Sequence, residues 1–309
     1  MLAKSRAPDK ERTLAIALAV LVTFLWSTSW VLIKLGLRQS LPALTFAGLR
    51  YTLAFLCLLP FMLLNREQRT QLKRLEGRDW GRLVALGLVY YTFTQGSQFL
   101  SLAYLPAALV SMLLNLTPVA VALGGLFFLG EKLGLGHWLG LLLAVVGVLV
   151  FFQPGSLPPD PWFGLAVAIF GVLTNAASSV MGRNVNRGRR LPALLVTFVS
   201  MGVGALLLLL LGGLIQGFGG LTWENWLLIA WLAVVNTALS FTLWNFSLRV
   251  LRAVESSILN SLMLPQIAIL AFFFLGERLS GREIAGLALV SLGVILVQVS
   301  SFKKKDASR

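Results

Sequence analysis

This sequence of 309 residues has few of the side chains that catalytic and metal sites use. It contains one cysteine, Cys57, and one histidine, His137, which excludes an internal disulfide and a metal site built from clustered histidines. Only 12 residues are Asp or Glu, and none lies in the middle of an apolar run. Glu255 comes nearest, about one turn inside the end of its run. We therefore expect no enzymatic activity, no metal and no cofactor.

Long apolar runs make up most of the chain. The composition is 57% hydrophobic with a mean hydropathy of +0.84, more apolar surface than a soluble domain of this size can bury. Lipid cannot hydrogen-bond an open backbone, and the runs lack the alternation of barrel strands. We predict an all-α integral membrane protein with ten transmembrane helices, near 13–35, 41–64, 82–104, 106–127, 134–153, 161–182, 192–215, 224–247, 254–275 and 282–301.

The net charge of +14 is distributed unevenly between the two ends of these runs. With a cytoplasmic N-terminus, 21 of the 26 Lys and Arg residues fall on the cytoplasmic side, four fall outside, and Arg50 lies within a run. This pattern follows the positive-inside rule, so we expect a cell (inner) membrane protein with both termini in the cytoplasm. The basic residues are then topology signals that also attract anionic lipid, and no nucleic-acid partner is expected. The four outside are Lys34, Arg38, Arg278 and Arg282.

One stretch of the sequence occurs twice. FFLGEKL at 127–133 returns as FFLGERL at 273–279, an offset of 146 residues, and the flanking apolar segments match at the same offset. We infer a cytoplasmic tail (1–12), a five-helix repeat (13–153), a linker (154–160), a second five-helix repeat (161–301) and a basic cytoplasmic tail (302–309). Because five is odd, the second repeat enters the membrane from the opposite face. Inverted repeats are typical of secondary transporters, although a duplicated unit could also form a static scaffold.

These features together resemble the drug/metabolite transporter superfamily, in particular its ten-helix EamA-type members. The resemblance is carried by Leu25-Trp26-Ser27-Thr28-Ser29-Trp30, by Arg50, by the paired Gly-Glu motifs ending at Glu131 and Glu277, and by Asn236-Thr237-Ala238 with Trp244-Asn245. It covers roughly residues 14–299 and implies export or exchange of small metabolites, often amino acids. The substrate varies within the family and is not implied.

Polar side chains within the apolar runs are the candidates for binding a substrate, because they are costly in lipid and face the protein interior. In the third run they recur with helical spacing, and the eighth run repeats the pattern. We predict that these stripes line a cavity for a small, partly apolar solute, while interhelical hydrogen bonding alone is the alternative. The candidates are Trp26, Ser27, Trp30, Tyr91, Thr94, Gln95, Gln98, Asn115, Asn175, Asn236, Ser240, Trp244 and Asn260.

Arg50 has the highest free-energy cost of any side chain in these runs, because its guanidinium stays charged within an apolar segment. It either binds a substrate carboxylate or has a structural role, holding loop ends in place through hydrogen bonds. Lys34, near the outer end of the first run, is expected to reach toward the lipid headgroups.

Two further pairs relate the repeats to each other. Glu131 and Glu277 follow glycine at the ends of runs, and we expect them to cap neighbouring helix ends or to pair with Lys132 and Arg278. Pro118 and Pro265 should kink the fourth and ninth helices, either as gating hinges or as packing features.

Small residues form a close-approach face in the fifth and tenth runs, at Gly140, Ala144, Gly147, Gly286 and Gly293. We favour packing of these two runs against each other within one chain. The alternative is that this face forms the surface of a homodimer.

A secondary transporter for small organic metabolites is the interpretation that accounts for most of these features. The alternative within transport is a nucleotide-sugar or other phosphorylated-metabolite exchanger, which would need several cations in the cavity. A channel or a membrane enzyme is less consistent with the duplication and with the scarcity of His, Cys and intramembrane acids. The expected partners are therefore a small-molecule substrate and the lipid bilayer.

Overall fold

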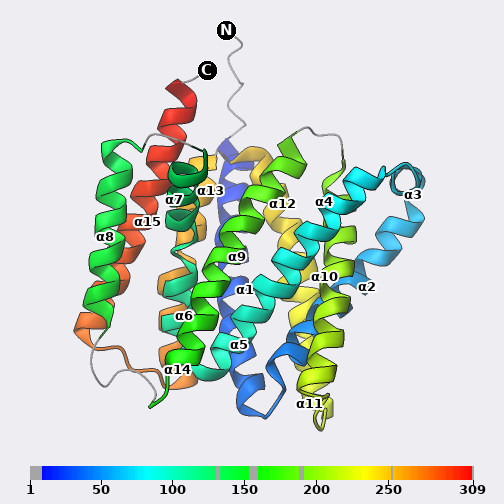
Figure 1. The fold of residues 1–309 in the computed structure, drawn as a ribbon, viewed down its shortest axis with the longest axis horizontal. Coiled ribbons are helices and arrows are strands. Elements are labelled where there is room, and N and C mark those ends of the chain that lie inside the picture. The colour runs from blue at the N-terminus through cyan, green and yellow to red at the C-terminus, as the bar shows by residue number, and fades with distance from the viewer. Residues whose placement is uncertain (1–8, 130–132, 153–158, 188–190, 252, 308–309) are drawn as a thin grey trace.

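The computed structural model describes residues 9–129, 133–152, 159–187, 191–251 and 253–307. Throughout these ranges the regular structure is helical, and the helices form a bundle (Figure 1). Within these described ranges, eight helices are long and apolar enough to cross a membrane, and α8, of 17 residues, is a shorter apolar helix. The sequence prediction of an all-α membrane protein is confirmed at this level.

The first half of the chain contains α1 (Asp9–Arg38), α2 (Ala43–Leu64) and the short polar helix α3 (Arg66–Lys73). The expected span at 82–104 is a helix in three segments: α4 (Gly77–Gly87), the π-helix η1 (Leu88–Gln95) and α5 (Gly96–Tyr104). The expected span at 106–127 is divided into α6 (Ala107–Leu114) and α7 (Thr117–Leu129), and α8 (Leu135–Phe151) follows.

The second half contains α9 (Trp162–Arg187) and α10 (Ala193–Ile215). Next comes a helix with a central π-helical segment, made of α11 (Trp223–Ala233), η2 (Val234–Leu239) and α12 (Ser240–Val250). Another divided helix, α13 (Ala253–Ser261) with α14 (Met263–Leu275), precedes α15 (Gly281–Ala307).

The irregularities of the two halves recur at the offset of the sequence repeat. The π-helices begin at Leu88 and Val234, the divided helices at Ala107 and Ala253, and the last helices at Leu135 and Gly281, each pair 146 residues apart. The breaks within the divided helices lie just before Pro118 and Pro265, where the missing proline N–H removes an intrahelical hydrogen bond. The two halves therefore share their local distortions as well as their sequence motif.

Two pairs of equivalent helices, one helix from each half, pack against each other in opposite directions. On α8 and α15, Gly140 lies against Gly293 while Gly147 lies against Gly286, so residue numbers rise on one helix as they fall on the other. On α2 and α10, Gly48 faces Leu209 and Gly212 faces Thr45. A Cβ atom on Gly147 would come within 2.6 Å of the Val290 backbone nitrogen. The small-residue face predicted from the sequence is thus buried within this chain.

The helices that begin each half cross to the other half. α1 packs against α12 and α14, whereas α9 packs against α5, η1 and α7. Both lie in the middle of the bundle, with α8 and α15 side by side at one edge (Figure 1). The start of α1 and the end of α15 lie at the same end of the molecule. The two halves are therefore interlocked, and the seams between them run through the centre.

Candidate functional site

Arg50 lies on α2 at the seam between the two halves, and it is 5% exposed. Its Nη1 donates to Ser29 Oγ on α1 at 2.9 Å, and its Nε and Nη2 donate to Thr237 Oγ1 of η2 at 3.3 and 3.2 Å. The guanidinium carbon also lies 5.1 Å from the ring centroid of Tyr51 and 5.8 Å from that of Phe99. Arg50 therefore joins α1, α2, α5 and η2 through neutral partners.

The π-helical turns place hydroxyl groups over backbone carbonyls five residues earlier. Thr94 donates to Val89 O at 2.9 Å, Thr237 to Leu232 O at 2.8 Å, and Ser240 to Val235 O at 2.8 Å. These bonds occupy carbonyls that a wide turn leaves poorly aligned, which is one local reason that Thr and Ser occur here. Because Thr237 donates backward along η2, its oxygen lone pairs point outward and accept from Arg50.

Asn236 precedes Thr237 and connects η2 to α1. Its Nδ2 donates to Leu25 O and, at 3.1 Å, to Thr28 Oγ1. The side chain is fully buried, and no donor among the described residues reaches its Oδ1. We call Thr28, Ser29, Arg50, Asn236 and Thr237 the polar seam.

The predicted stripe of the third run is divided between two neighbouring helices. Gln95 accepts from Tyr51 on α2 at 2.6 Å, whereas Thr94 contacts Thr174 on α9 at 3.1 Å. Tyr91 is buried, with its ring 5.6 Å from that of Tyr51, and Gln98 is half-buried. The prediction of a single stripe assumed 3.6 residues per turn, and the wider turn of η1 changes the side-chain directions.

Trp26, Trp244 and Phe241 form an aromatic cluster between α1 and α12. The Trp26 ring lies 5.2 Å from that of Trp244 and 5.4 Å from that of Phe241. Trp30, one turn further along α1, is 8% exposed and belongs to the main apolar core. The structure thus brings two of the three predicted tryptophans together and places the third in the apolar core.

Each divided helix is contacted near its break by a polar residue of a central helix. Asn175 on α9 donates to Thr117 at 3.0 Å, and Ser27 on α1 donates to Gln266 Oε1 at 3.0 Å. Asn115 caps the end of α6 through Ser111 O at 3.1 Å, and Asn260 is exposed. Gln266 was missed in the sequence reasoning, because it is an isolated polar residue in an apolar run.

Charged residues near the loops opposite the chain ends bind helix termini of other segments. Lys34 donates to Leu102 O and Leu105 O at 2.5 and 2.7 Å, so the expected reach toward lipid headgroups is wrong. Its ammonium instead satisfies carbonyls at the end of α5, where the helix dipole favours a cation. Arg38 donates to Leu275 O at the end of α14 at 2.9 Å.

Glu277 caps the first turn of α6, as one of the sequence alternatives anticipated. Its carboxylate accepts from the backbone N–H groups of Ala107 and Ala108 at 2.7 and 3.1 Å. Glu131, its counterpart, lies outside the described residues. At the other end of the molecule, Glu255 forms an ion pair with Arg12 at 2.5 Å. Within the described ranges, no three His, Cys, Asp or Glu residues are placed to hold a metal.

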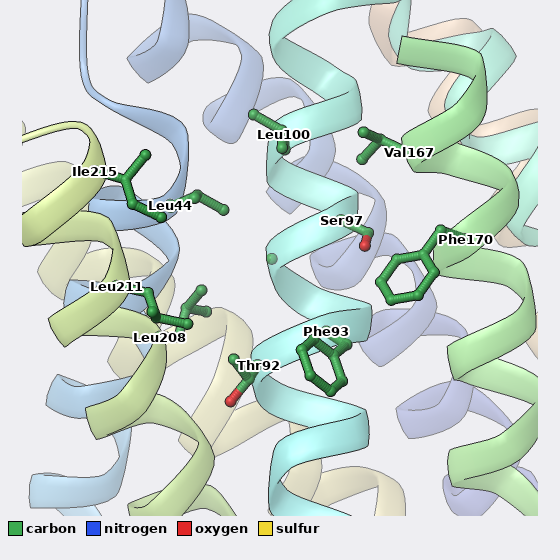
Figure 2. A pocket seen from close by; sticks show the side chains of 11 residues that line it. Leu44, Thr92, Phe93, Ser97, Leu100, Val167, Phe170, Leu208, Leu211 and Ile215 are labelled. Carbon is green, nitrogen blue, oxygen red and sulfur yellow. The ribbon is translucent and has the colours of Figure 1, made fainter. Parts of the chain in front are cut away.

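A groove beside η1 has none of the predicted substrate residues among its lining residues. Its floor is η1 and α5, and its walls come from α2, α10 and α9 (Figure 2). Its lining is mostly apolar, and Phe93 and Phe170 are 42% and 47% exposed. Its lining also includes buried side chains, among them Thr92, Ser97 and Leu208.

A bundle of long apolar helices with a polar interior seam defines a multi-pass membrane protein. Residues 13–153 and 162–299 match the EamA-like transporter family, and the chain belongs to that family. This confirms the resemblance drawn from the sequence motifs.

The chain is similar along nearly its whole length to several bacterial transporters. It is 29% identical over 304 residues to the uncharacterized transporter YvbV of Bacillus subtilis, covering 97% of this chain and 95% of the relative. It is 26% identical over 308 residues to a protein of Salmonella typhimurium named "Probable amino-acid metabolite efflux pump", covering 94% and 97%. A solved crystal structure matches with a TM-score of 0.63 at 19% identity, covering 92% of this chain and 97% of the other, which shows the shared fold.

Proposed function

We propose that this protein is a secondary transporter that moves small organic metabolites, such as amino acids, across the cell membrane. In this proposal ten membrane-spanning helices form two inverted five-helix repeats, both termini are cytoplasmic, and rocking of the interlocked halves exposes the site to each side in turn. The observation that carries it is the antiparallel packing of equivalent helices, α2 with α10 and α8 with α15. The relatives named as amino-acid metabolite efflux pumps support the substrate class.

The substrate site in this proposal lies between the polar seam and the aromatic cluster. Gln98, Asn115, Asn175 and Trp244 are half-buried side chains that would meet a solute there. A nucleotide-sugar or other phosphorylated substrate is the alternative. It is less favoured because, of the described interior cations, Lys34 is already bound to carbonyls and Arg50 alone is left to meet a diphosphate.

Counterflow in proteoliposomes tests the proposal. Vesicles loaded with an unlabelled amino acid should transiently accumulate the labelled form above equilibrium, because a carrier exchanges solutes and a channel does not. Trp244→Ala and Gln98→Ala should reduce the initial rate at least tenfold. Ser179→Ala, at an exposed position on α9, should match the wild type. Equilibration without overshoot for a full panel of amino acids would contradict the proposal.

A further inference from the structure

The charge balance of the polar seam limits what the site accepts. Arg50 is buried, and each of its contacts is neutral: two hydroxyl groups and two aromatic rings. In the part of the chain that the structure describes, no carboxylate pairs with it, and the ion pair of Arg12 with Glu255 lies at the end of the bundle.

This positive charge is permanent and only partly satisfied. A guanidinium has five N–H donors and keeps its proton in proteins. Three of these donors are engaged with Ser29 and Thr237. A buried charge without a counter-ion is expensive, and its potential extends through the surrounding low-dielectric interior.

A second buried polar side chain joins the same two helices, α1 and η2, that hold this cation. Asn236 is fully buried, its Nδ2 donates to Leu25 and Thr28, and its Oδ1 has no donor in the part of the chain that the structure describes. Thr28 and Ser29 are adjacent on α1, and Asn236 and Thr237 are adjacent on η2, so the amide and the guanidinium share one interface. The polar seam thus presents free N–H donors on a cation together with one free acceptor.

We propose that the polar seam selects solutes by charge. It accepts zwitterions or monoanions, with the carboxylate toward Arg50 and an N–H group toward Asn236, and it rejects solutes with a net positive charge. This inference rests on the proposed transport function and names the substrate class. Two like charges ~8 Å apart at an effective dielectric of ~20 give roughly 30-fold discrimination. The single positive charge of one guanidinium would leave half of the charge of a dianionic phosphate uncompensated.

The test uses three amino acids of similar size: glutamine, glutamate and lysine. Initial uptake is measured in proteoliposomes at neutral pH for the wild type, Arg50→Gln and Arg50→Lys. We expect the wild type to take up lysine about 30-fold more slowly than glutamine. Arg50→Gln should reduce this difference to less than fivefold, and Arg50→Lys, which keeps the charge, should preserve it. Lys73→Gln, at an exposed position on α3, is the control and should behave as the wild type does.

A second variant covers the case in which Arg50→Gln does not fold. Asn236→Asp keeps the side-chain shape and places a carboxylate in the polar seam that contains Arg50, so it should raise lysine uptake toward that of glutamine. Equal uptake of lysine and glutamine by the wild type would overturn the charge selection. An unchanged preference for glutamine over lysine in a folded Arg50→Gln or Asn236→Asp protein would also overturn the charge selection. Absence of counterflow for every solute would instead overturn the transport function, and the charge selection with it.

Discussion

At the residue scale, the structure depends on how one buried guanidinium is solvated. Arg50 was identifiable from the sequence as a costly charge, but its partners were not. Ser29 lies 21 positions before it and Thr237 lies 187 positions after it, and nothing in the local sequence relates them. Thr237 can accept because its own proton is donated to Leu232 O within a π-helical turn. Periodicity assuming 3.6 residues per turn cannot anticipate that turn.

Thr237→Val should lower stability by about 1–3 kcal/mol, because it removes the acceptor shared by Nε and Nη2 and leaves part of a buried charge unsatisfied. Thr242→Val is the matched control, since Thr242 also bonds backward to its helix but is exposed. Thermal unfolding of the two purified variants in the same detergent measures the difference. Equal melting temperatures would show that Thr237 does not support Arg50.

At the element scale, the positions of the helices were largely predictable and their interruptions only partly so. Apolar runs of about 20 residues identify membrane helices whatever their neighbours, and the prolines indicated where two helices break. The residues that bind helix ends were harder to predict, because the carbonyls at the ends of α5 and α14 lie far along the sequence from the side chains that bind them. Lys34 was therefore expected to reach the lipid headgroups, and Arg38 was placed outside without a named partner. Their contacts instead join α1 to α5 and to α14.

Because α8 and α15 pack closely, adding one methyl group at their interface should strongly lower the stability of the protein. Gly147→Ala should destabilise the protein by about 1–3 kcal/mol, because its Cβ would lie 2.6–2.8 Å from backbone atoms of Val290 and Gly286. Gly124→Ala is the control, since nothing lies within 4 Å of its Cβ position and alanine is the better helix former. Thermal melts should show a lower midpoint for the first variant and an unchanged or higher one for the second.

The cap that Glu277 provides to α6 predicts a separate effect. Glu277→Ala should cost about 1–2 kcal/mol, since the N–H groups of Ala107 and Ala108 lose a charged acceptor near the start of a helix. Glu277→Gln keeps one acceptor oxygen and should retain part of this stability. A Glu277→Ala protein that melts with the wild type would show that the cap contributes nothing measurable.

At the scale of the whole molecule, the proposed inversion and the cytoplasmic termini are linked to one orientation in the membrane. The loop between α1 and α2 should face outside, and α3 should face the cytoplasm. In a Cys57→Ser background, we expect a membrane-impermeant maleimide to label Gln39→Cys on intact cells. Gln71→Cys should be labelled only after the membrane is opened. The reverse result would overturn the orientation derived from the distribution of positive charges.

The pairing of two helices of each half with their own counterparts also bears on how such a protein could arise. α2 contacts α10, and α8 contacts α15, through faces that occupy equivalent places in the two halves. A single five-helix ancestor, inserted in either direction, could have assembled with an oppositely oriented copy of itself through those same faces. Gene fusion would then have joined a pre-existing pair. Afterwards the halves could diverge, so that one side of the seam carries Arg50 while the other contributes only neutral groups.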